Sequence, residues 1–159
     1  MTMDTIHWKE GGLGGTIYRT QGAKALAYIL EPEPVTDKVA SVAEELSLTL
    51  VSISGMDWNR DLSPWKAEKV FKGEEDFSGG ADDFMEKLEN KVFPAIEEMA
   101  GPLPDRRMMA GISLSGLFAL YMGARSSAFS AIASISGSLW FDGFTDFMKE
   151  KGLHPAVKR

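Results

Sequence analysis

The segment MAGISLSGLFALYM, residues 109–122, changes its pattern at Ser113. A short apolar run precedes Ser113, and the apolar residues 117–121 that follow it have the spacing of a helix. Small residues flank the serine, with Gly111 two positions before it and Ser115 two positions after it. The segment therefore predicts a strand, a tight turn at Ser113 and a helix.

This pattern is close to the nucleophile elbow G-x-S-x-G, in which a strained turn between a strand and a helix exposes a serine hydroxyl. The sequence reads G-x-S-x-S-G, because Ser115 takes the second glycine position and Gly116 follows one place late. Ser113 is the candidate nucleophile, and the N–H of Leu114 is placed to donate to a developing oxyanion. A structural alternative stays open, since serines before a helix commonly cap it and Ser115 could do so.

The composition is typical of one globular domain over residues 1–159, with 44% hydrophobic and 25% charged residues. The net charge is −6 and the basic residues are scattered, which argues against nucleic acid as a partner. The chain contains no cysteine, which excludes disulfides and thiolate sites. Neither a signal-peptide pattern nor an apolar stretch of roughly 18 residues is found, so we expect a cytoplasmic protein without membrane contact.

Elsewhere in the chain, short apolar runs alternate with helical spacings. Strands are expected at 16–20, 24–30, 48–55, 106–112 and 130–137, and helices at 36–47, 82–101, 115–125 and 145–152. Such an alternation predicts a three-layer α/β/α fold with a mostly parallel sheet.

Three features interrupt this alternation. The glycine-rich residues 11–15 are expected to form a turn rather than a phosphate-binding loop, because a strand follows them. Pro94 is expected to kink or restart its helix. Residues 55–83 form a long connection without a period, and connections of this length usually carry function.

Three ordered blocks resemble the Putative esterase family of the α/β-hydrolase superfamily, the group related to siderophore esterases and the esterase D type. GISLSGLFALYMGARSSAFSAIASISGSLWF, residues 111–141, is similar to that family's G-Y-S-L-G-G-L-F-A-L-Y and later S-x-S-x-x-W motifs. WNRDLSPW (58–65) and SGGADDFMEKLENKVFPAIEE (78–98) resemble its R-D-Y-T-P loop and G-G-A-x-x-F-x-x-F helix. The resemblance covers roughly residues 24–148 and implies an α/β-hydrolase fold that hydrolyses a small acyl ester or thioester, without metal or other cofactor.

Carried over position by position, the resemblance implies that Ser113 accepts the acyl group and that Leu114 N–H is one oxyanion donor. The second donor is expected around Met56, in the loop after the strand that ends at Gly55. Arg60 stands at the arginine of the R-D-x-[ST]-P motif and would hold an anionic or carbonyl-rich part of the substrate.

Each substrate-binding candidate has a structural alternative. Arg60 could instead form an ion pair with Asp61 or another acid of its loop. Trp58, Trp65 and Trp140 would line a pocket, although tryptophans commonly serve as core or loop-packing residues.

The acid and base of a triad have no clear candidates. The superfamily order is Ser, then Asp or Glu, then His, and the only two histidines are His7 and His154. His7 precedes the expected strands, and His154, after a single further strand and helix, is expected to be a surface residue. Asp142 follows the last expected strand, where a minority of related hydrolases keep their acid.

The resemblance therefore implies the N-terminal part of an α/β-hydrolase, lacking the C-terminal strands of the fold. We expect such a chain to be nearly inactive alone. Its last strand would leave a hydrophobic sheet edge that pairs with a second copy or with a separate C-terminal piece.

Two other functions stay open. A non-catalytic binding domain could retain the hydrolase fold, because fold alone does not establish chemistry. A flavodoxin-like domain could bind phosphate at a turn after a strand, but that site needs glycine-rich or Ser/Thr-rich loops, and SGMDWN (54–59) is poor in them.

Overall fold

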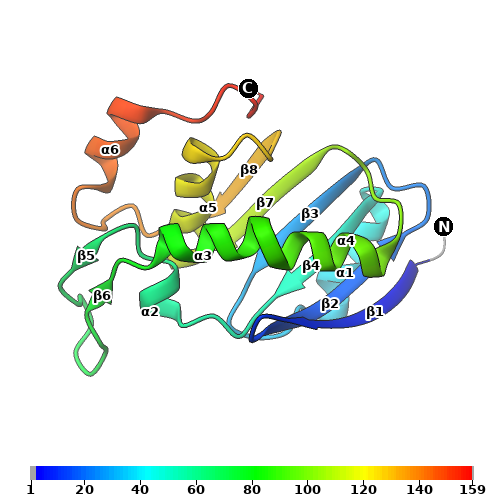
Figure 1. The fold of residues 1–159 in the computed structure, drawn as a ribbon, viewed down its shortest axis with the longest axis horizontal. Coiled ribbons are helices and arrows are strands. Elements are labelled where there is room, and N and C mark those ends of the chain that lie inside the picture. The colour runs from blue at the N-terminus through cyan, green and yellow to red at the C-terminus, as the bar shows by residue number, and fades with distance from the viewer. Residues whose placement is uncertain (1–2, 159) are drawn as a thin grey trace.

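The computed structural model describes residues 3–158, which form a six-stranded sheet with helices on both faces (Figure 1). The strand order is β1-β2-β4-β3-β7-β8. The β1–β2 and β2–β4 pairs are antiparallel, and the β4–β3, β3–β7 and β7–β8 pairs are parallel. The predicted three-layer α/β/α fold with a mostly parallel sheet is confirmed.

The sheet strands are β1 (Met3–Glu10), β2 (Leu13–Thr20), β3 (Ala25–Leu30), β4 (Leu48–Ile53), β7 (Arg107–Ile112) and β8 (Ala131–Ile135). The helices are α1 (Asp37–Glu45), α2 (Trp58–Asp61), α3 (Ala81–Lys87), η1 (Leu88–Val92), α4 (Phe93–Ala100), α5 (Leu114–Arg125) and α6 (Phe144–Lys151). A small second ribbon, β5 (Lys66–Ala67) with β6 (Phe77–Ser78), lies within the long connection between β4 and α3.

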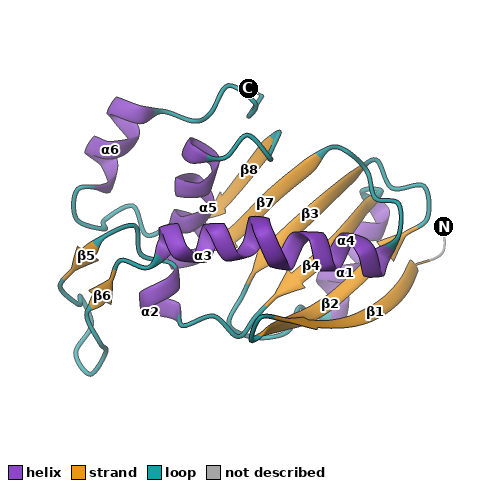
Figure 2. Ribbon diagram, viewed as in Figure 1, coloured by secondary structure: helices purple, strands orange, loops and turns teal. Residues whose placement is uncertain are grey.

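Alternate residues of β3 face two different cores. Leu26, Tyr28 and Leu30 pack with α3, α4 and α5 in the larger core. Ala27 and Ile29 pack with α1 in the smaller one. Figure 2 shows the corresponding layers, with α3 and α4 running across one face of the orange sheet and α1 behind it. Because β3 is buried on both faces, it fixes the middle of the sheet.

The first strand was not predicted from the sequence. β1 pairs along its whole length with β2 through a turn at Gly11 and Gly12, which both have positive φ. It is an edge strand, and Trp8 is its one fully buried side chain. Since polar or charged residues occupy five of its other seven positions, its period-2 signal is weak. The strand after Ser47 is therefore the fourth strand along the chain and not the third.

Two of the predicted helices, 36–47 and 82–101, have local features that their residue ranges alone did not indicate. In α1 the small residues Ala40 and Ala43 face the sheet, while Val39 and Val42 stay exposed. In the helix over 82–101, Pro94 lies in the first turn of α4, directly after the π-helical turn η1. Proline cannot donate to the preceding turn, and the wider π-turn accommodates that loss. The predicted local effect of Pro94, a kink or a restart, takes the form of the π-turn η1 in a helix that otherwise continues from α3 into α4.

The sheet ends at β8, and no other strand of residues 3–158 pairs with its outer edge. Across the described part of the chain, no helix combines the length and the apolar character that crossing a membrane requires.

Candidate active site

Ser113 forms the turn between β7 and α5, with φ 57° and ψ −120°. A positive φ is costly for a residue other than glycine and persists only where the surroundings enforce it. Here the Ser113 N–H donates to the Ile135 carbonyl at 3.0 Å. The Ser113 carbonyl accepts from the N–H groups of Leu117 at 3.1 Å and Ser138 at 3.0 Å. Three backbone hydrogen bonds thus hold a strained serine whose side chain is exposed.

Gly111 and Ser115 explain why the turn closes so tightly. A β-carbon built at Gly111 would come within 2.7 Å of the Gly116 nitrogen, and closer still to the Ser115 carbonyl. The Ser115 hydroxyl is fully buried, accepts from the Ile112 N–H at 2.7 Å and reaches the Leu30 carbonyl at 2.8 Å. Ser115 therefore joins the turn to β3, and it does not cap α5. Of the two serines, Ser113 is the exposed one.

Leu114 begins α5 immediately after the turn. Its side chain is buried, but the N–H of a first helical residue has no acceptor inside the helix. This N–H lies at the positive end of the helix dipole, beside the Ser113 hydroxyl. The arrangement favours negative charge next to Ser113.

The sheet order shifts the expected second oxyanion donor away from Met56. In α/β-hydrolases that donor comes from the loop between the third strand and the following helix. The third strand here is β3, because residues 3–10 form an additional strand. In the sheet, Leu30 of β3 is paired directly with Gly111, whereas β4, which precedes Met56, lies one strand farther away. The loop 31–36 is thus the better candidate, and Met56 is half-buried against the main core.

The sequence analysis missed Ser138, whose Oγ lies 3.3 Å from the Ser113 Oγ. Ser138 follows β8, at the same edge of the sheet as the turn at Ser113. The signal that could have identified it is the serine-rich segment 134–138, which follows a strand parallel to β7.

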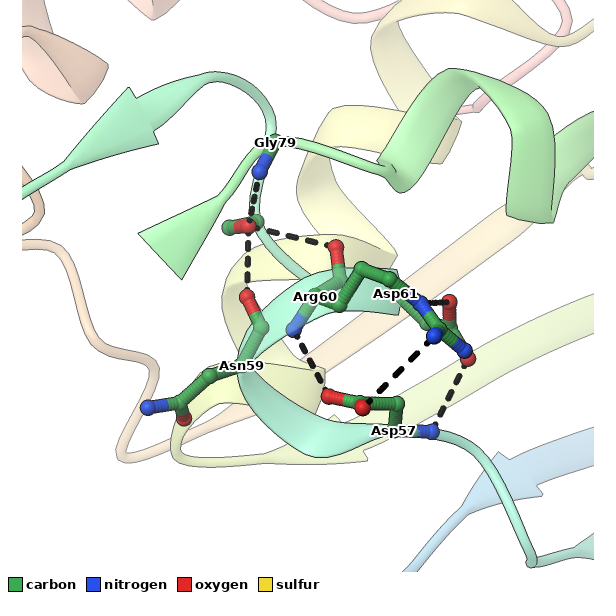
Figure 3. A network of polar contacts seen from close by, with 6 residues as sticks. Asp57, Asn59, Arg60, Asp61 and Gly79 are labelled. Atoms are coloured by element: carbon green, nitrogen blue, oxygen red, sulfur yellow. Dashed lines mark hydrogen bonds and ion pairs between the residues drawn. The ribbon is translucent and has the colours of Figure 1, made fainter. Parts of the chain in front are cut away.

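Arg60 is held by two carboxylates of its own short helix, as Figure 3 shows. Its Nε donates to Asp61 at 3.0 Å, and its guanidinium lies 3.7 Å from an Asp57 oxygen. The hydrogen bond to Asp61, with the charges of both acids, raises the pKa of Arg60 above its ordinary value. The structure therefore contains the ion pair that was the alternative for Arg60. The two carboxylates balance the positive charge of the guanidinium.

The three tryptophans have different surroundings. Trp58 is half-buried against the main core. Trp65 lies among the rings of Phe141, Phe144 and Phe147, and its Nε1 donates to the Asp142 carbonyl at 2.8 Å. Trp140 is 50% exposed and meets Phe71 edge to face. Of these three residues, Trp140 is the one that keeps a largely exposed ring, two positions after Ser138.

The histidines lie away from Ser113. His7 is on β1, across the sheet from β7, with its Nδ1 3.2 Å from the Thr16 hydroxyl. The His154 N–H donates to the Gly123 carbonyl at 2.8 Å. Gly123 lies near the far end of α5, about 14 Å along the helix from its start. The His154 ring is half-buried, and its Nδ1 accepts from the Ala156 N–H at 3.0 Å.

The acid candidate has no contact with the turn either. The Asp142 side chain is exposed. The hydrogen bond from Trp65 is accepted by the Asp142 backbone carbonyl and not by its carboxylate. The structure thus brings together Ser113, Leu114 and Ser138, but neither the predicted acid nor a histidine.

A polar cluster anchors α5 to α3. The Tyr121 hydroxyl donates to Asp82 at 2.6 Å, and Arg125 contacts both groups. Burial, followed by the hydrogen bond to Asp82, raises the pKa of Tyr121 to about 12. Burial alone would raise the pKa of Asp82, but hydrogen bonds from Arg125 and Tyr121 hold it below its ordinary value. The cluster ties the C-terminal half of α5 to α3.

A pocket of about 550 Å³ lies at the same edge of the sheet as Ser113, lined by residues 9–14 with Ser54 and Gly55, and Ser113 is not part of its wall. Residues 3–158 hold no group of three or more histidine or acidic side chains arranged to bind a metal ion.

Known proteins share this fold and part of this sequence. A family model described as "Putative esterase" matches residues 5–153. The uncharacterized protein YbbA of Bacillus subtilis is 30% identical over 115 residues, which are 70% of this chain and 46% of YbbA.

Among solved structures, an IroE-like serine hydrolase from Shewanella oneidensis superposes with a TM-score of 0.76 at 22% identity. That match covers 94% of this chain and 56% of the other. The siderophore hydrolase EstA from Aspergillus nidulans has a TM-score of 0.67 at 18% identity, covering 93% of this chain and 61% of EstA. The chain therefore has the α/β-hydrolase fold and spans about half to three-fifths of the length of these relatives.

Proposed function

The chain belongs to the Putative esterase family, and from that premise we propose that it carries the nucleophile of a serine carboxylic-ester hydrolase, with Ser113 as the acyl acceptor. The observation that carries the proposal is the exposed Ser113 hydroxyl on a positive-φ turn between β7 and α5. A strained, exposed serine at that junction is the feature on which this class of enzyme depends.

In the proposed reaction, the Ser113 Oγ attacks the carbonyl carbon of an ester or thioester while a base takes its proton. The carbonyl oxygen becomes an oxyanion, and the Leu114 N–H donates to it. When the carbonyl re-forms, the bond to the alcohol or thiol breaks and the leaving group takes the proton. A water molecule then repeats the attack on the acyl-serine and frees both the acid and Ser113.

The second oxyanion donor is proposed in the loop 31–36. Pro32 and Pro34 have no N–H, and the Glu31 N–H already donates to the Ile53 carbonyl at 3.1 Å. These contacts leave the N–H groups at positions 33, 35 and 36 as candidates. The exposed ring of Trp140, two residues after Ser138, supports an apolar acyl or alcohol group in the substrate.

The base and acid are proposed to come from outside these 159 residues. His7 and His154 both make other contacts, far from Ser113. In a related mechanism, loss of the histidine lowers kcat on the order of 10⁶-fold, so we propose that this chain alone is at most a very slow hydrolase.

The outer edge of β8 is proposed to pair with a second copy of the chain. The strand AIASI contains neither charge nor proline, and its end residue Ile135 is 49% exposed beside Ile112. Edges that lack such blocking residues readily pair with other strands.

Imidazole rescue tests the proposed function on the chain as it is. Hydrolysis of p-nitrophenyl acetate is followed with increasing imidazole, which can take the place of a missing histidine at an open site. Imidazole also hydrolyses the ester without the protein, so the rate measured with Ser113→Ala is subtracted from the wild-type rate at each imidazole concentration. Ser127→Ala, which replaces another exposed serine, is the matched control. We expect a rate that rises with imidazole and depends on Ser113. Equal rates for wild type and Ser113→Ala at every imidazole concentration would refute the proposal.

A non-catalytic binding domain is the second candidate. It is favoured by the two prolines of loop 31–36, which reduce the number of oxyanion donors, and by the distance of both histidines from Ser113. A well-folded chain that fails the imidazole test would support this candidate.

A further inference from the structure

Ser138 contacts the reacting oxygen of the candidate nucleophile, and we propose that it is a positioning residue for Ser113. Its hydroxyl holds the Ser113 hydroxyl in one orientation and donates a hydrogen bond to the Ser113 oxygen as the attack develops. The inference rests on the proposed function, because it assigns a role in the same reaction.

The two serines are linked both by their backbones and by their side chains. The Ser138 N–H donates to the Ser113 carbonyl at 3.0 Å, and the two Oγ atoms are 3.3 Å apart. The residue Ser138 is only 2% exposed, so its hydroxyl is turned away from bulk water. A buried hydroxyl requires a partner, and here the partner is the exposed nucleophile.

The turn that carries Ser138 is itself constrained. Ser136 has φ 47°, a second positive value for a serine at this edge of the sheet. A β-carbon at Gly137 would overlap the Ser134 hydroxyl and lie 3.5 Å from the Gly116 carbonyl carbon. The turn therefore packs directly on the first turn of α5. Backbone strain of this kind is retained where a particular geometry is needed, and here it delivers one hydroxyl to Ser113.

A hydroxyl can both donate and accept, which suits the two stages of the reaction. At rest, the Ser113 hydroxyl can donate to Ser138. When the base removes the Ser113 proton, the Ser113 oxygen is an acceptor only, and Ser138 donates to it while keeping its own proton. The 3.3 Å separation is longer than a typical hydroxyl pair, and such contacts shorten when substrate binds.

The test compares the rates at which a fluorophosphonate labels Ser113, measured with imidazole present. Loss of one neutral hydrogen bond predicts that Ser138→Ala labels roughly three- to tenfold more slowly, and that Ser138→Thr restores part of the rate. Ser134→Ala is the matched control, because the Ser134 hydroxyl donates to the Gly116 carbonyl at 2.8 Å and does not touch Ser113. An unchanged rate in Ser138→Ala, or an equal loss in Ser134→Ala, would overturn the inference.

A second readout does not depend on reactivity. Crystal structures of wild type and Ser138→Ala should show one Ser113 rotamer facing Ser138 in the former, and a different or divided rotamer in the latter. Labelling of Ser113→Ala as fast as wild type would refute the proposed function. An identical Ser113 rotamer in the wild-type and Ser138→Ala crystals would separately overturn the positioning role of Ser138. Should Ser138→Ala lose its native circular dichroism, Ser138→Cys, which keeps the volume with a weaker donor, replaces it.

Discussion

Replacing Ser115 by alanine should weaken the fold, because this serine is buried in the turn. The Ser115 hydroxyl accepts the Ile112 N–H at 2.7 Å and reaches the buried Leu30 carbonyl at 2.8 Å. Its removal leaves two backbone groups without their partner. A buried polar group left unpaired costs about 1–3 kcal/mol, and water can reach the exposed Ile112 more easily than Leu30. We therefore expect a loss of about 3 kcal/mol in the free energy of unfolding.

Urea unfolding followed by circular dichroism measures this loss. With a slope of about 2 kcal/mol per molar, the midpoint of Ser115→Ala should fall by about 1.5 M. Ser113→Ala is the comparison variant, because the Ser113 side chain is exposed and its removal leaves only the Ser138 hydroxyl without a partner, which should cost about 1 kcal/mol, less than Ser115→Ala. Equal midpoints for the two variants, with an unchanged slope, would refute the assignment of Ser115 to the turn and of Ser113 to the surface.

Three further outcomes follow from the same contacts. Glycine tolerates positive φ, so the free energy of unfolding of Ser113→Gly should be about 1 kcal/mol higher than that of Ser113→Ala in the same urea assay, and a lower value would show that the turn is not strained. The pKa of Tyr121 is raised to about 12, so the stability contributed by its protonated hydroxyl is complete below pH 10 and is lost as the pH rises to 12. Tyr121→Phe should therefore flatten the decline of the unfolding free energy between pH 10 and 12. Tyr18→Phe should leave that decline unchanged. Ile135→Lys should reduce self-association measured by light scattering, with exposed Val42→Lys as control, and a monomeric wild type at high concentration would count against pairing through β8.

The sequence predicted the middle of the fold well, because β3, β4 and β7 are apolar runs separated by helical periods. It missed β1 because an edge strand needs few buried side chains, and only Trp8 is fully buried there. That omission had a functional consequence. With β1 uncounted, the loop after β4 follows the third expected strand, which is why the sequence favours Met56, whereas the pairing of Leu30 with Gly111 supports the loop 31–36.

The strand–turn–helix at Ser113 was predictable because the steric demands of the tight turn act on neighbouring residues. Gly111 and Ser115 are needed within two positions of Ser113, so the requirement is visible in the sequence. The contact with Ser138 was not visible, because it depends on the register of β7 with β8 and on the turn after β8. For Arg60, the sequence allowed either substrate binding or an ion pair. In the structure its guanidinium is paired with Asp61 and lies near Asp57, the N-cap of the same short helix.

The central claim is that the β7–α5 turn presents Ser113 as a reactive surface nucleophile. Mass spectrometry of the intact chain after fluorophosphonate treatment in imidazole, followed by peptide mapping, tests it most directly. We predict a single adduct on the peptide that contains Ser113, absent from Ser113→Ala. An unmodified chain, or an adduct on any other residue, would contradict the account.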